Sequence, residues 1–498
     1  MRIDHIYLKN YRCFDSLPIT LDPHMTVLVA PNGQGKTSIL DAIKVALWPY
    51  VAGYDLGSTT NDITSIHIDD VRREQVRPHE MDWRLPAEIK ATGKLRVRQL
   101  LLDGTLEIDF PEHQGDAANN SAASDENLTW QCVRYRQSIK KGTKTKSLVI
   151  ARELDLSETA QALERRLFSG EQTLPDDLPM LGYYGTGRLW AQKKLTAAYE
   201  NSDKEALSRT FAYRDCLDPA SSYKHFVQWY ARIFKSFRSA QIRNIEKRLL
   251  PDALVPDGLL APVRAIQLAT DAVLGSHTGW RELEYSEEHK ELVLNHEQYG
   301  QLKISQLSDG IRNMLALVGD IAYRCYKLNA HMGEAAPRRT HGIVMIDEVD
   351  MHLHPSWQQT VLTDLKIAFP NLQFIVTTHS PQVTSSIPSK NIRILSEGKI
   401  FAASPGTEGA ESSRLLKRLF GVESRPPNNS ATKRLNEYLT LVYADRWETL
   451  RANRLRKLLN ARYKGEEPAL TAADLHIENE KWEKSLDDDL GGNVENHL

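Results

Sequence analysis

The fold is decided by Ala30-Pro31-Asn32-Gly33-Gln34-Gly35-Lys36-Thr37-Ser38. This stretch lies between the apolar run 25–29, which has the composition of a buried strand, and a segment with apolar residues at helical spacing. A strand, a glycine-rich loop and a helix in this order are typical of a phosphate-binding P-loop. Ala30 occupies the position of the first glycine in the general P-loop pattern, so the match rests on the remaining residues.

The two glycines of this loop explain why the pattern suits a nucleotide. Gly33 and Gly35 let the backbone approach phosphate oxygens, and consecutive amides form a concave nest for an anion. We expect Lys36 to contact the β- and γ-phosphates and Thr37 to place its hydroxyl on Mg²⁺. The predicted ATP-binding residues of the loop are Asn32, Gly33, Gln34, Gly35, Lys36, Thr37 and Ser38.

An acidic pair follows another apolar strand far downstream. The apolar residues 343–346 run directly into Asp347-Glu348, so a buried strand is expected to deliver this pair beside the P-loop. There Asp347 is predicted to hold Mg²⁺, directly or through water, and Glu348 to polarise the attacking water as general base. The competing interpretation is an ordinary strand end with acidic residues at the start of a helix.

Two further segments complete the candidate site. His379 ends another apolar strand, where its imidazole can contact the γ-phosphate and report whether it is still attached; a capped core histidine is the alternative. The signature segment, Ser308-Asp309-Gly310, precedes the predicted helix 311–326. The partial positive charge and free amides of a helix N-terminus suit phosphate, although the serine equally satisfies the requirement for an N-cap.

The bulk properties exclude several classes of protein. A chain of 498 residues is too long for one compact core, so a head with insertions is expected. The formal net charge of −2 provides no global attraction to nucleic acid, and the four cysteines contain no CxxC pair that would indicate structural zinc. Without an apolar signal core or an apolar run of about 18 residues, a cytoplasmic protein with no membrane contact is predicted.

The patterns along the chain predict an α/β fold: a two-lobed P-loop ATPase head with a β-hairpin subdomain, a helical insertion and a C-terminal helical tail. Lys90–Phe110 alternates as a β-hairpin does, with Asp103-Gly104 as its turn. The predicted divisions are 1–110, the first lobe with the P-loop; 111–199, a β-rich subdomain; 200–279, the helical insertion; 280–404, the second lobe; and 405–498, a helical tail that binds a partner.

Three segments allow more than one interpretation. His352 and His354 have the HxH spacing of a metal site, but third and fourth ligands are not evident, so a loop between subunits is preferred. Residues 224–248 contain seven Lys or Arg against one acidic residue, and residues 433–464 are also basic. Both segments allow salt-sensitive DNA contact. Their aromatic and apolar residues fit helix cores better than base stacking, and those of the tail also suit a docking face.

These motifs resemble those of the SMC/RecF-like ABC ATPases. The resemblance rests on the opening Leu8–Phe14, the P-loop, Leu307–Gly310 and Asp347-Glu348. It implies that two heads divide one ATP, so that Ser308, Asp309 and Gly310 of one copy act in trans on the P-loop of another. It also implies ATP and Mg²⁺ as cofactors, Arg12 near the nucleotide, and Gln75 in the glutamine loop of the family as a further Mg²⁺ ligand.

A narrower resemblance concerns Tyr183–Trp190, Asp350–Pro355 and the helical tail, which are similar to the ATPase subunit (PtuA) of bacterial Septu anti-phage systems. Such ATPases also occur with retrons. This similarity implies a homo-oligomer built from head-to-head dimers, a PtuB-like HNH nuclease partner, and a retron reverse transcriptase with its DNA as a further candidate partner.

The expected function is therefore an ATP-hydrolysing regulator of a nuclease. A RecF-like DNA repair clamp without a nuclease partner is the first alternative. A scaffold that binds ATP without hydrolysing it is the second, and the presence of Glu348 and His379 argues against it.

Overall fold

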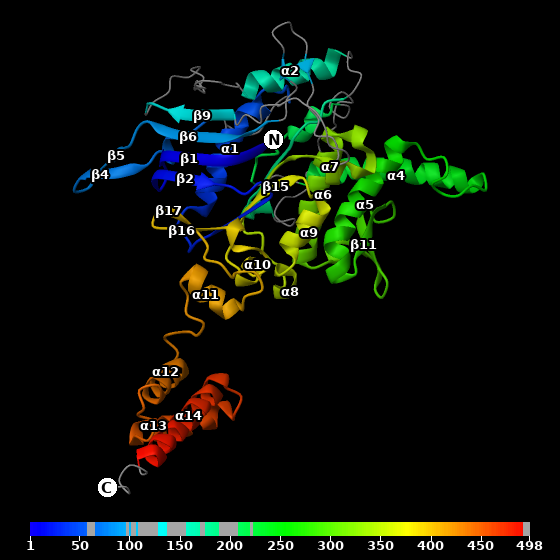
Figure 1. Ribbon diagram of the computed structural model, residues 1–498. Coiled ribbons are helices and arrows are strands. Elements are labelled where there is room, and N and C mark those ends of the chain that lie inside the picture. Colours follow the sequence, from blue (N-terminus) through cyan, green and yellow to red (C-terminus); the bar gives the residue numbers. More distant parts are fainter. Residues whose placement is uncertain are drawn as a thin grey trace, which may run out of the picture. The chain divides into compact units, whose positions relative to one another are not determined.

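The computed structural model describes residues 1–56, 65–95, 99–100, 106–107, 128–136, 156–169, 175–188, 208–219 and 223–491. The chain divides into two compact units, Met1–Leu415 and Leu416–Leu498, and Figure 1 colours it along the sequence from blue to red. All residues predicted for the nucleotide site belong to the first unit. Among the described helices, none is both long and apolar enough to cross a bilayer.

A six-stranded sheet forms the centre of the first unit, with the strand order β10-β14-β15-β3-β16-β17. The first five strands are parallel, and β17 pairs antiparallel with β16. Their bounds are Met180–Tyr184 for β10, Gly342–Ile346 for β14, Leu372–Thr378 for β15, Met25–Val29 for β3, Ile392–Ser396 for β16 and Lys399–Ala402 for β17. Every residue of β3, β10, β14 and β15 is buried, because both faces of the sheet are covered. The apolar runs before the P-loop, before Asp347 and before His379 are thus confirmed as buried strands.

A four-stranded antiparallel sheet with the order β2-β1-β6-β9 belongs to the same unit (Figure 1). Its strands are Arg2–Tyr11 for β1, Phe14–Thr20 for β2, Ala87–Lys94 for β6 and Leu128–Arg134 for β9. Gln373 of β15 ties the two sheets together, since its amide accepts from the N–H of Ile3 at 2.9 Å and donates to the carbonyl of Ile3 at 2.7 Å. On β9, Trp130 donates its indole N–H to the carbonyl of Ala46 at 2.9 Å, in the helix α1 (Lys36–Ala52).

The predicted hairpin over residues 90–110 is divided between two sheets. Its first part is β6, which pairs with β1 and β9. Beyond it, Gln99–Leu100 (β7) and Leu106–Glu107 (β8) form a separate antiparallel ladder. The predicted turn at Asp103-Gly104 lies outside the described residues. Two other small sheets are described: the pair β4 (Arg73–Arg77) and β5 (Glu80–Trp83), and the triple β11 (Arg281–Ser286), β12 (Glu291–His296) and β13 (Gly300–Lys303).

Helices surround these sheets and include one, α2, that the sequence patterns did not predict. The α-helices in the described part of the first unit are α1 (Lys36–Ala52), α2 (Leu156–Ser169), α4 (Lys224–Glu246), α5 (Asp257–Thr278), α6 (Asp309–Leu328), α7 (Ala336–Arg339), α8 (Pro355–Gln358), α9 (Val361–Ala368) and α10 (Pro381–Thr384), and α11 (Ser412–Phe420) spans the boundary to the second unit. The helix expected after the signature segment is confirmed as α6, which is amphipathic and is capped by Ser308.

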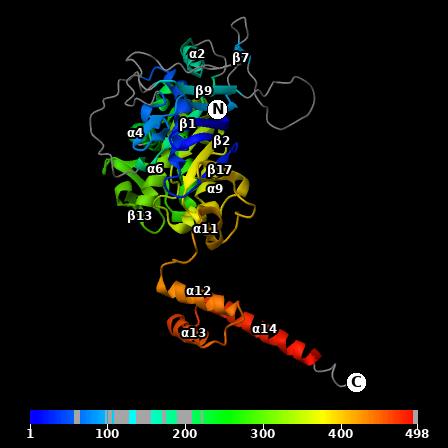
Figure 2. The ribbon, with the colours of Figure 1, turned by 90° about the vertical axis from the view of Figure 1, so that its left-hand side faces the viewer.

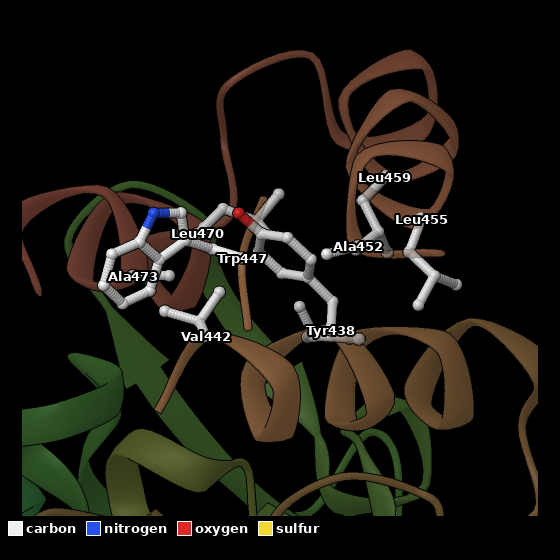
Figure 3. Close-up of a cluster of buried hydrophobic side chains, with 9 residues drawn as sticks. Tyr438, Val442, Trp447, Ala452, Leu455, Leu459, Leu470 and Ala473 are labelled. Atoms are coloured by element: carbon white, nitrogen blue, oxygen red, sulfur yellow. The ribbon is translucent and has the colours of Figure 1, made fainter. Parts of the chain in front are cut away.

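The second unit consists mainly of three helices, α12 (Ser430–Val442), α13 (Leu450–Tyr463) and α14 (Pro468–Gly491), which Figure 2 shows as one group. Their apolar side chains converge on Trp447, which lies in the connection between α12 and α13 (Figure 3). The buried cluster consists of Leu435, Tyr438, Val442, Trp447, Ala452, Leu455, Leu459, Leu470 and Ala473. The helical tail therefore has a hydrophobic core of its own.

Candidate ATP site

The topology of the central sheet brings the motifs of the candidate site to one edge. The P-loop follows β3, His379 follows β15, and Asp347 follows β14. These three parallel strands are immediate neighbours in the order β14-β15-β3. Because the carboxyl ends of parallel strands lie on the same side, the loops after them meet where ligands of open α/β sheets bind.

The P-loop has a backbone that accepts glycine far better than any other residue at two positions. Gly33 has φ 79° and Gly35 has φ 95°, both in the left-handed region. At Gly35 space is missing as well, since a Cβ atom would lie 2.7 Å from both the Cys13 sulfur and the ring of Phe14. The loop thus turns sharply into α1 against β2 and the residue before it, leaving its amides to face an anion.

Lys36 is almost fully buried and lies against its own loop. Its ammonium donates to the carbonyl of Ala30 at 2.8 Å and to that of Pro31 at 3.3 Å. Burial lowers the pKa of Lys36, and the carboxylates of Asp347, Glu348 and Asp350 oppose this shift. A buried ammonium in a glycine-rich loop is suited to bind a polyphosphate, whose negative charge offsets the cost of burying the cation.

Asp347 forms hydrogen bonds to both flanking strands. Thr37 of the P-loop donates its hydroxyl to one carboxylate oxygen at 2.8 Å, and Thr377 of β15 donates to the other at 2.5 Å. The backbone N–H of Asp347 donates to the carbonyl of Tyr184 in β10 at 2.8 Å. The aspartate is therefore oriented by β10, β15 and the start of α1, and its pairing with Thr37 is the arrangement that a shared Mg²⁺ requires.

Glu348 adopts a backbone conformation that is unusual for a residue with a side chain. Its φ is 49°, in the left-handed region, and its N–H donates to the hydroxyl of Thr377 at 2.8 Å. The next N–H, that of Val349, donates to the carbonyl of Thr377 at 3.0 Å. The turn directly after β14 is thus held by one threonine, and Glu348 remains half-buried at the sheet edge.

His379 shares the electrostatic environment of the P-loop. Burial and then the positive charge of Lys36 lower the pKa of its imidazole from 6.5, and the carboxylates of Asp350, Glu348 and Asp347 oppose them. The ring is consequently neutral at neutral pH, when it can either donate or accept a hydrogen bond. Ser380 beside it caps α10 and donates to the amide oxygen of Gln358 at 2.7 Å.

Comparison with known proteins agrees with this geometry. A family model for an AAA domain matches residues 5–250, and a second AAA-domain model matches residues 219–385. Together these matches extend over the P-loop edge, the signature segment and both downstream strands. Both models describe AAA domains and together span residues 5–385, so the chain belongs to the AAA-domain ATPases.

The ATPase has relatives among the proteins of retrons and Septu systems. It is 28% identical to the retron Ec83 probable ATPase of Escherichia coli, over 98% of this chain and 89% of that one. It is 26% identical to the retron Vc95 probable ATPase of Vibrio cholerae, over 80% and 74% of the two chains. A shorter match, 33% identical, joins 28% of the chain to 19% of the Septu protein PtuA of Bacillus mycoides.

The signature segment of the ATPase is exposed at its first two residues and buried at its third. Ser308 and Asp309 are exposed, and the hydroxyl of Ser308 accepts from the N–H of Ile311 at 3.5 Å. At Gly310 a Cβ atom would lie 2.6 Å from the carbonyl oxygen of His352, so only glycine fits there. Within the described part of the chain, no hydrogen bond or ion pair joins the signature segment to residues 30–38.

Arg12 contacts the helix that follows the P-loop. Its guanidinium donates to Asp41 at 2.7 Å, to Asp70 at 2.8 Å and to the hydroxyl of Ser38 at 3.4 Å. Gln75, in contrast, lies on the exposed β4. No hydrogen bond among the described residues joins Gln75 to Thr37 or Asp347, so its contacts give no support to a role as Mg²⁺ ligand.

The HxH segment after the acidic pair is not a strand. His352 lies in a turn with φ 64°, and His354 caps α8, with its ring nitrogen accepting from the N–H of Ser356 at 3.3 Å. The histidines therefore shape the loop that contacts Gly310. This agrees with the preference for a loop over a metal site, and the use of the loop between subunits stays a prediction.

Several aromatic and apolar residues of the two basic segments are internal, although Ile242 and Ile245 near the end of α4 are exposed. In α4, Phe226, Tyr230, Phe234 and Phe237 are buried. In the tail, Leu435, Tyr438 and Val442 belong to the core of the second unit, which corrects their interpretation as a docking face; Leu450, in contrast, is 91% exposed. Two tail cations form ion pairs at short range, Arg451 with Glu437 at 2.7 Å and Arg456 with Asp474 at 2.6 Å. Pairing reduces the positive charge that these two arginines offer to DNA.

Two residues with a clear role in the site were not identified from the sequence. Thr377 bonds to both members of the acidic pair, and Asp41 links Arg12 to α1, where it also pairs with Lys44 at 3.1 Å. The sequence signal that could have identified them is a polar residue at the end of an apolar strand, for Thr377, and a polar residue among the apolar positions of a helix, for Asp41. Their partners, however, lie at distant positions in the sequence.

Proposed function

We propose that the ATPase hydrolyses ATP in a site completed by two copies of the chain, and that the nucleotide state controls an HNH nuclease in anti-phage defence. One observation carries the proposal. Ser308 and Asp309 are exposed at the N-terminus of α6, and no hydrogen bond or ion pair within the described residues joins them to the P-loop of their own chain. A second copy is the natural source of the signature segment that closes over the phosphates.

In this proposal the P-loop amides and Lys36 bind the β- and γ-phosphates, while Arg12 supports α1 beside them. The hydroxyl of Thr37 and the carboxylate of Asp347, which lie 2.8 Å apart, are hard oxygen ligands that fit Mg²⁺. When bound, the ion neutralises charge that develops on the phosphates. Ser308, Asp309 and Gly310 of the second copy present the N-terminus of α6 to the γ-phosphate.

Glu348 acts as the general base. It accepts a proton from a water molecule whose oxygen attacks the γ-phosphorus, and the bond from phosphorus to the bridging oxygen breaks to give ADP and phosphate. The hydrogen bond from its own N–H to Thr377 holds the turn that carries the carboxylate. The neutral imidazole of His379 contacts the γ-phosphate and is released when phosphate leaves, which links hydrolysis to opening of the pair.

The names of the relatives support the proposal that this activity operates in an anti-phage defence system. Two are probable ATPases of retrons and one is a Septu protein. We propose that this chain likewise belongs to an anti-phage complex, in which dimers closed by ATP hold a PtuB-like HNH nuclease in one state. A retron reverse transcriptase and its DNA are further candidate members of the complex.

Mixing two inactive variants tests the shared site. Lys36→Ala removes phosphate binding, and Ser308→Arg allows ATP to bind but blocks closure, so each variant alone is expected to lack ATPase activity. A mixed dimer contains one intact site, built from the P-loop of the Ser308→Arg chain and the signature segment of the Lys36→Ala chain. Random pairing should restore roughly a quarter of the normal turnover, because half of the dimers are mixed and each has one intact site.

Two outcomes would contradict the shared site. The first is full ATPase activity of the Ser308→Arg variant alone. The second is that mixing restores no ATPase activity although light scattering shows that dimers form. The nuclease partner is tested separately, by purifying the ATPase from its native operon and identifying its companions by mass spectrometry. An HNH protein in stable stoichiometry supports the defence complex. Recovery of the ATPase without any nuclease supports the RecF-like clamp instead.

A further inference from the structure

The second unit brings together three side chains that are suited to a metal ion. Asp445 lies in the turn after α12, and His476 and Glu480 lie on α14. One donor atom from each, two carboxylate oxygens and an imidazole nitrogen, all lie within 4.8 Å of one another. This is the only such group found among the described residues, and it does not involve the nucleotide site.

The backbone determines where these three groups point. His476 and Glu480 are four residues apart, so they share one face of α14. Asp445 has φ 56°, and the turn around it is closed by two backbone hydrogen bonds, from its own N–H to Val442 at 3.0 Å and from Arg446 to Leu441 at 2.8 Å. The carboxylate of Asp445 is thus presented to α14 by a turn whose shape is independent of any ligand.

A second observation points to a ligand. The Nε2 atom of His476 is buried and has no hydrogen-bond partner among the described residues. Its ring packs against Tyr443 at 5.0 Å and Trp447 at 6.5 Å between centroids, and neither forms a hydrogen bond with Nε2. A buried polar nitrogen without a partner is costly, and a metal ion is a partner for this atom in the neutral ring.

We propose that Asp445, His476 and Glu480 bind a first-row transition-metal dication of the Zn²⁺ type. One imidazole and two carboxylates form a mixed nitrogen–oxygen set that suits zinc and its neighbours better than Mg²⁺, which prefers oxygen ligands and its own waters. Ligand atoms around tetrahedral Zn²⁺ are about 3.3 Å apart, so the donor atoms need to close inward by no more than about 1.5 Å. Asp445 is exposed and Glu480 is half-buried, which leaves both carboxylates free to rotate, and water completes the coordination.

The ion would join the turn after α12 directly to the middle of α14. This connection lies beside the Trp447 cluster, since the ring of His476 is 6.5 Å from that of Trp447. The cluster includes Trp447 from the same connection and Leu470 and Ala473 from α14 (Figure 3). Metal binding therefore stabilises the three-helix arrangement of the second unit, because an ion that binds only the folded state favours that state. This inference does not depend on the proposed ATPase cycle.

Titration of the full chain with Co²⁺, without nucleotide, provides the test, since Co²⁺ in a zinc-type site absorbs visible light. We expect one equivalent to bind with a visible spectrum, to be displaced by Zn²⁺, and to persist in excess Mg²⁺. His476→Ala and Glu480→Gln should each weaken this binding by at least about tenfold. Glu478→Gln, on the same helix but outside the ligand group, should bind like the unmodified chain.

Circular dichroism of each variant checks that the helices persist, and Glu480→Gln is the conservative substitution for the case in which His476→Ala unfolds the unit. A second readout is hydrogen exchange, in which Zn²⁺ should slow exchange in residues 443–447 and 473–484 of the unmodified chain and leave the Glu480→Gln chain unchanged. The proposal is overturned if Glu480→Gln and Glu478→Gln bind Co²⁺ with the same affinity, or if Zn²⁺ protects both variants equally.

Discussion

The sheet edge that carries the P-loop, Asp347, Glu348 and His379 (the P-loop edge) differs from the second unit of this ATPase in how far apart its contacting residues are in sequence. At the edge, contacts join residues that are remote in sequence: Thr37 and Asp347 lie 310 positions apart, and their hydrogen bond is 2.8 Å long. In the second unit the contacts are local, as in the ion pair of Arg456 with Asp474, 18 positions away. The edge therefore assembles polar groups at the ends of fully buried strands, whereas the core of the second unit is one small apolar cluster.

This difference predicts that mutations at the P-loop edge and mutations in the second unit affect different properties of the protein. Changing a polar residue at the edge should reduce ATP turnover with little loss of fold, because the strands beneath are buried on both faces. Changing an apolar residue of the second unit should reduce the stability of that unit, because a small core provides only a small free energy of unfolding.

The largest effect is expected for Glu348→Gln. Loss of the general base should slow ATP turnover by about 10² to 10⁴-fold and leave nucleotide binding intact. ATP-closed dimers should then accumulate, which light scattering with saturating ATP measures. Glu397→Gln is the matched control, since Glu397 also has φ 49° but lies in the exposed turn between β16 and β17. Turnover by the Glu348→Gln chain at the rate of this control would remove Glu348 from its proposed role.

Trp447→Ala tests the apolar cluster of the second unit. Trp447 is only 9% exposed, so its truncation should cost about 3 to 5 kcal/mol of unfolding free energy in that unit. Thermal unfolding of the full chain should show an early transition for α12–α14, while the affinity of the first unit for ATP stays unchanged. Trp482→Ala is the control, because Trp482 of α14 is 63% exposed. Equal melting curves for the two variants would contradict the importance of the cluster.

Thr377→Val tests the threonine that holds both acidic residues. The substitution keeps the shape of the side chain but leaves a carboxylate oxygen of Asp347 and the N–H of Glu348 without this hydroxyl, at a cost of about 1 to 3 kcal/mol. ATP turnover should fall with stability. Thr270→Val in α5 is the control, because that buried hydroxyl bonds only to helix carbonyls at Ile266 and Gln267. If the control loses as much turnover, the effect at Thr377 is not specific.

The smallest effect concerns pH and the pair of Glu467 with Arg425 in the second unit. Two hydrogen bonds of 2.6 and 2.9 Å from Arg425 lower the pKa of Glu467 below 4.5. The pair therefore stabilises the unit above pH 4.5, and the contribution disappears as pH falls through the lowered pKa. Glu467→Gln should cost on the order of 1 kcal/mol at pH 7 and less at pH 3, which lies below the ordinary pKa of 4.5. Urea unfolding at both values measures this, with the exposed Glu466→Gln as control; a pH-independent difference would contradict the linkage.

The sequence predicted those elements correctly in which a short local pattern specifies both a strand or helix and the functional residue beside it. The apolar runs before Lys36, Asp347 and His379 form buried strands, and the helix after Ser308 begins at Asp309 as α6. It was less successful at the hairpin expected over residues 90–110, because alternation specifies a strand but not its partner: β6 pairs with β1 and β9 instead. It also could not tell whether Leu435, Tyr438 and Val442 face a partner or a core, since both uses require the same helical spacing.

The sequence by itself determined that this protein is a P-loop ATPase with an acidic pair, a histidine and a separate signature segment, because each of these depends on residue types in a short order. Only the tertiary structure decided that Thr377 supports Asp347 and Glu348 together, and that His476 faces Asp445 across the turn after α12. Such relations depend on which strands are neighbours and which helix faces meet, and these follow from the burial of the whole chain rather than from any local pattern.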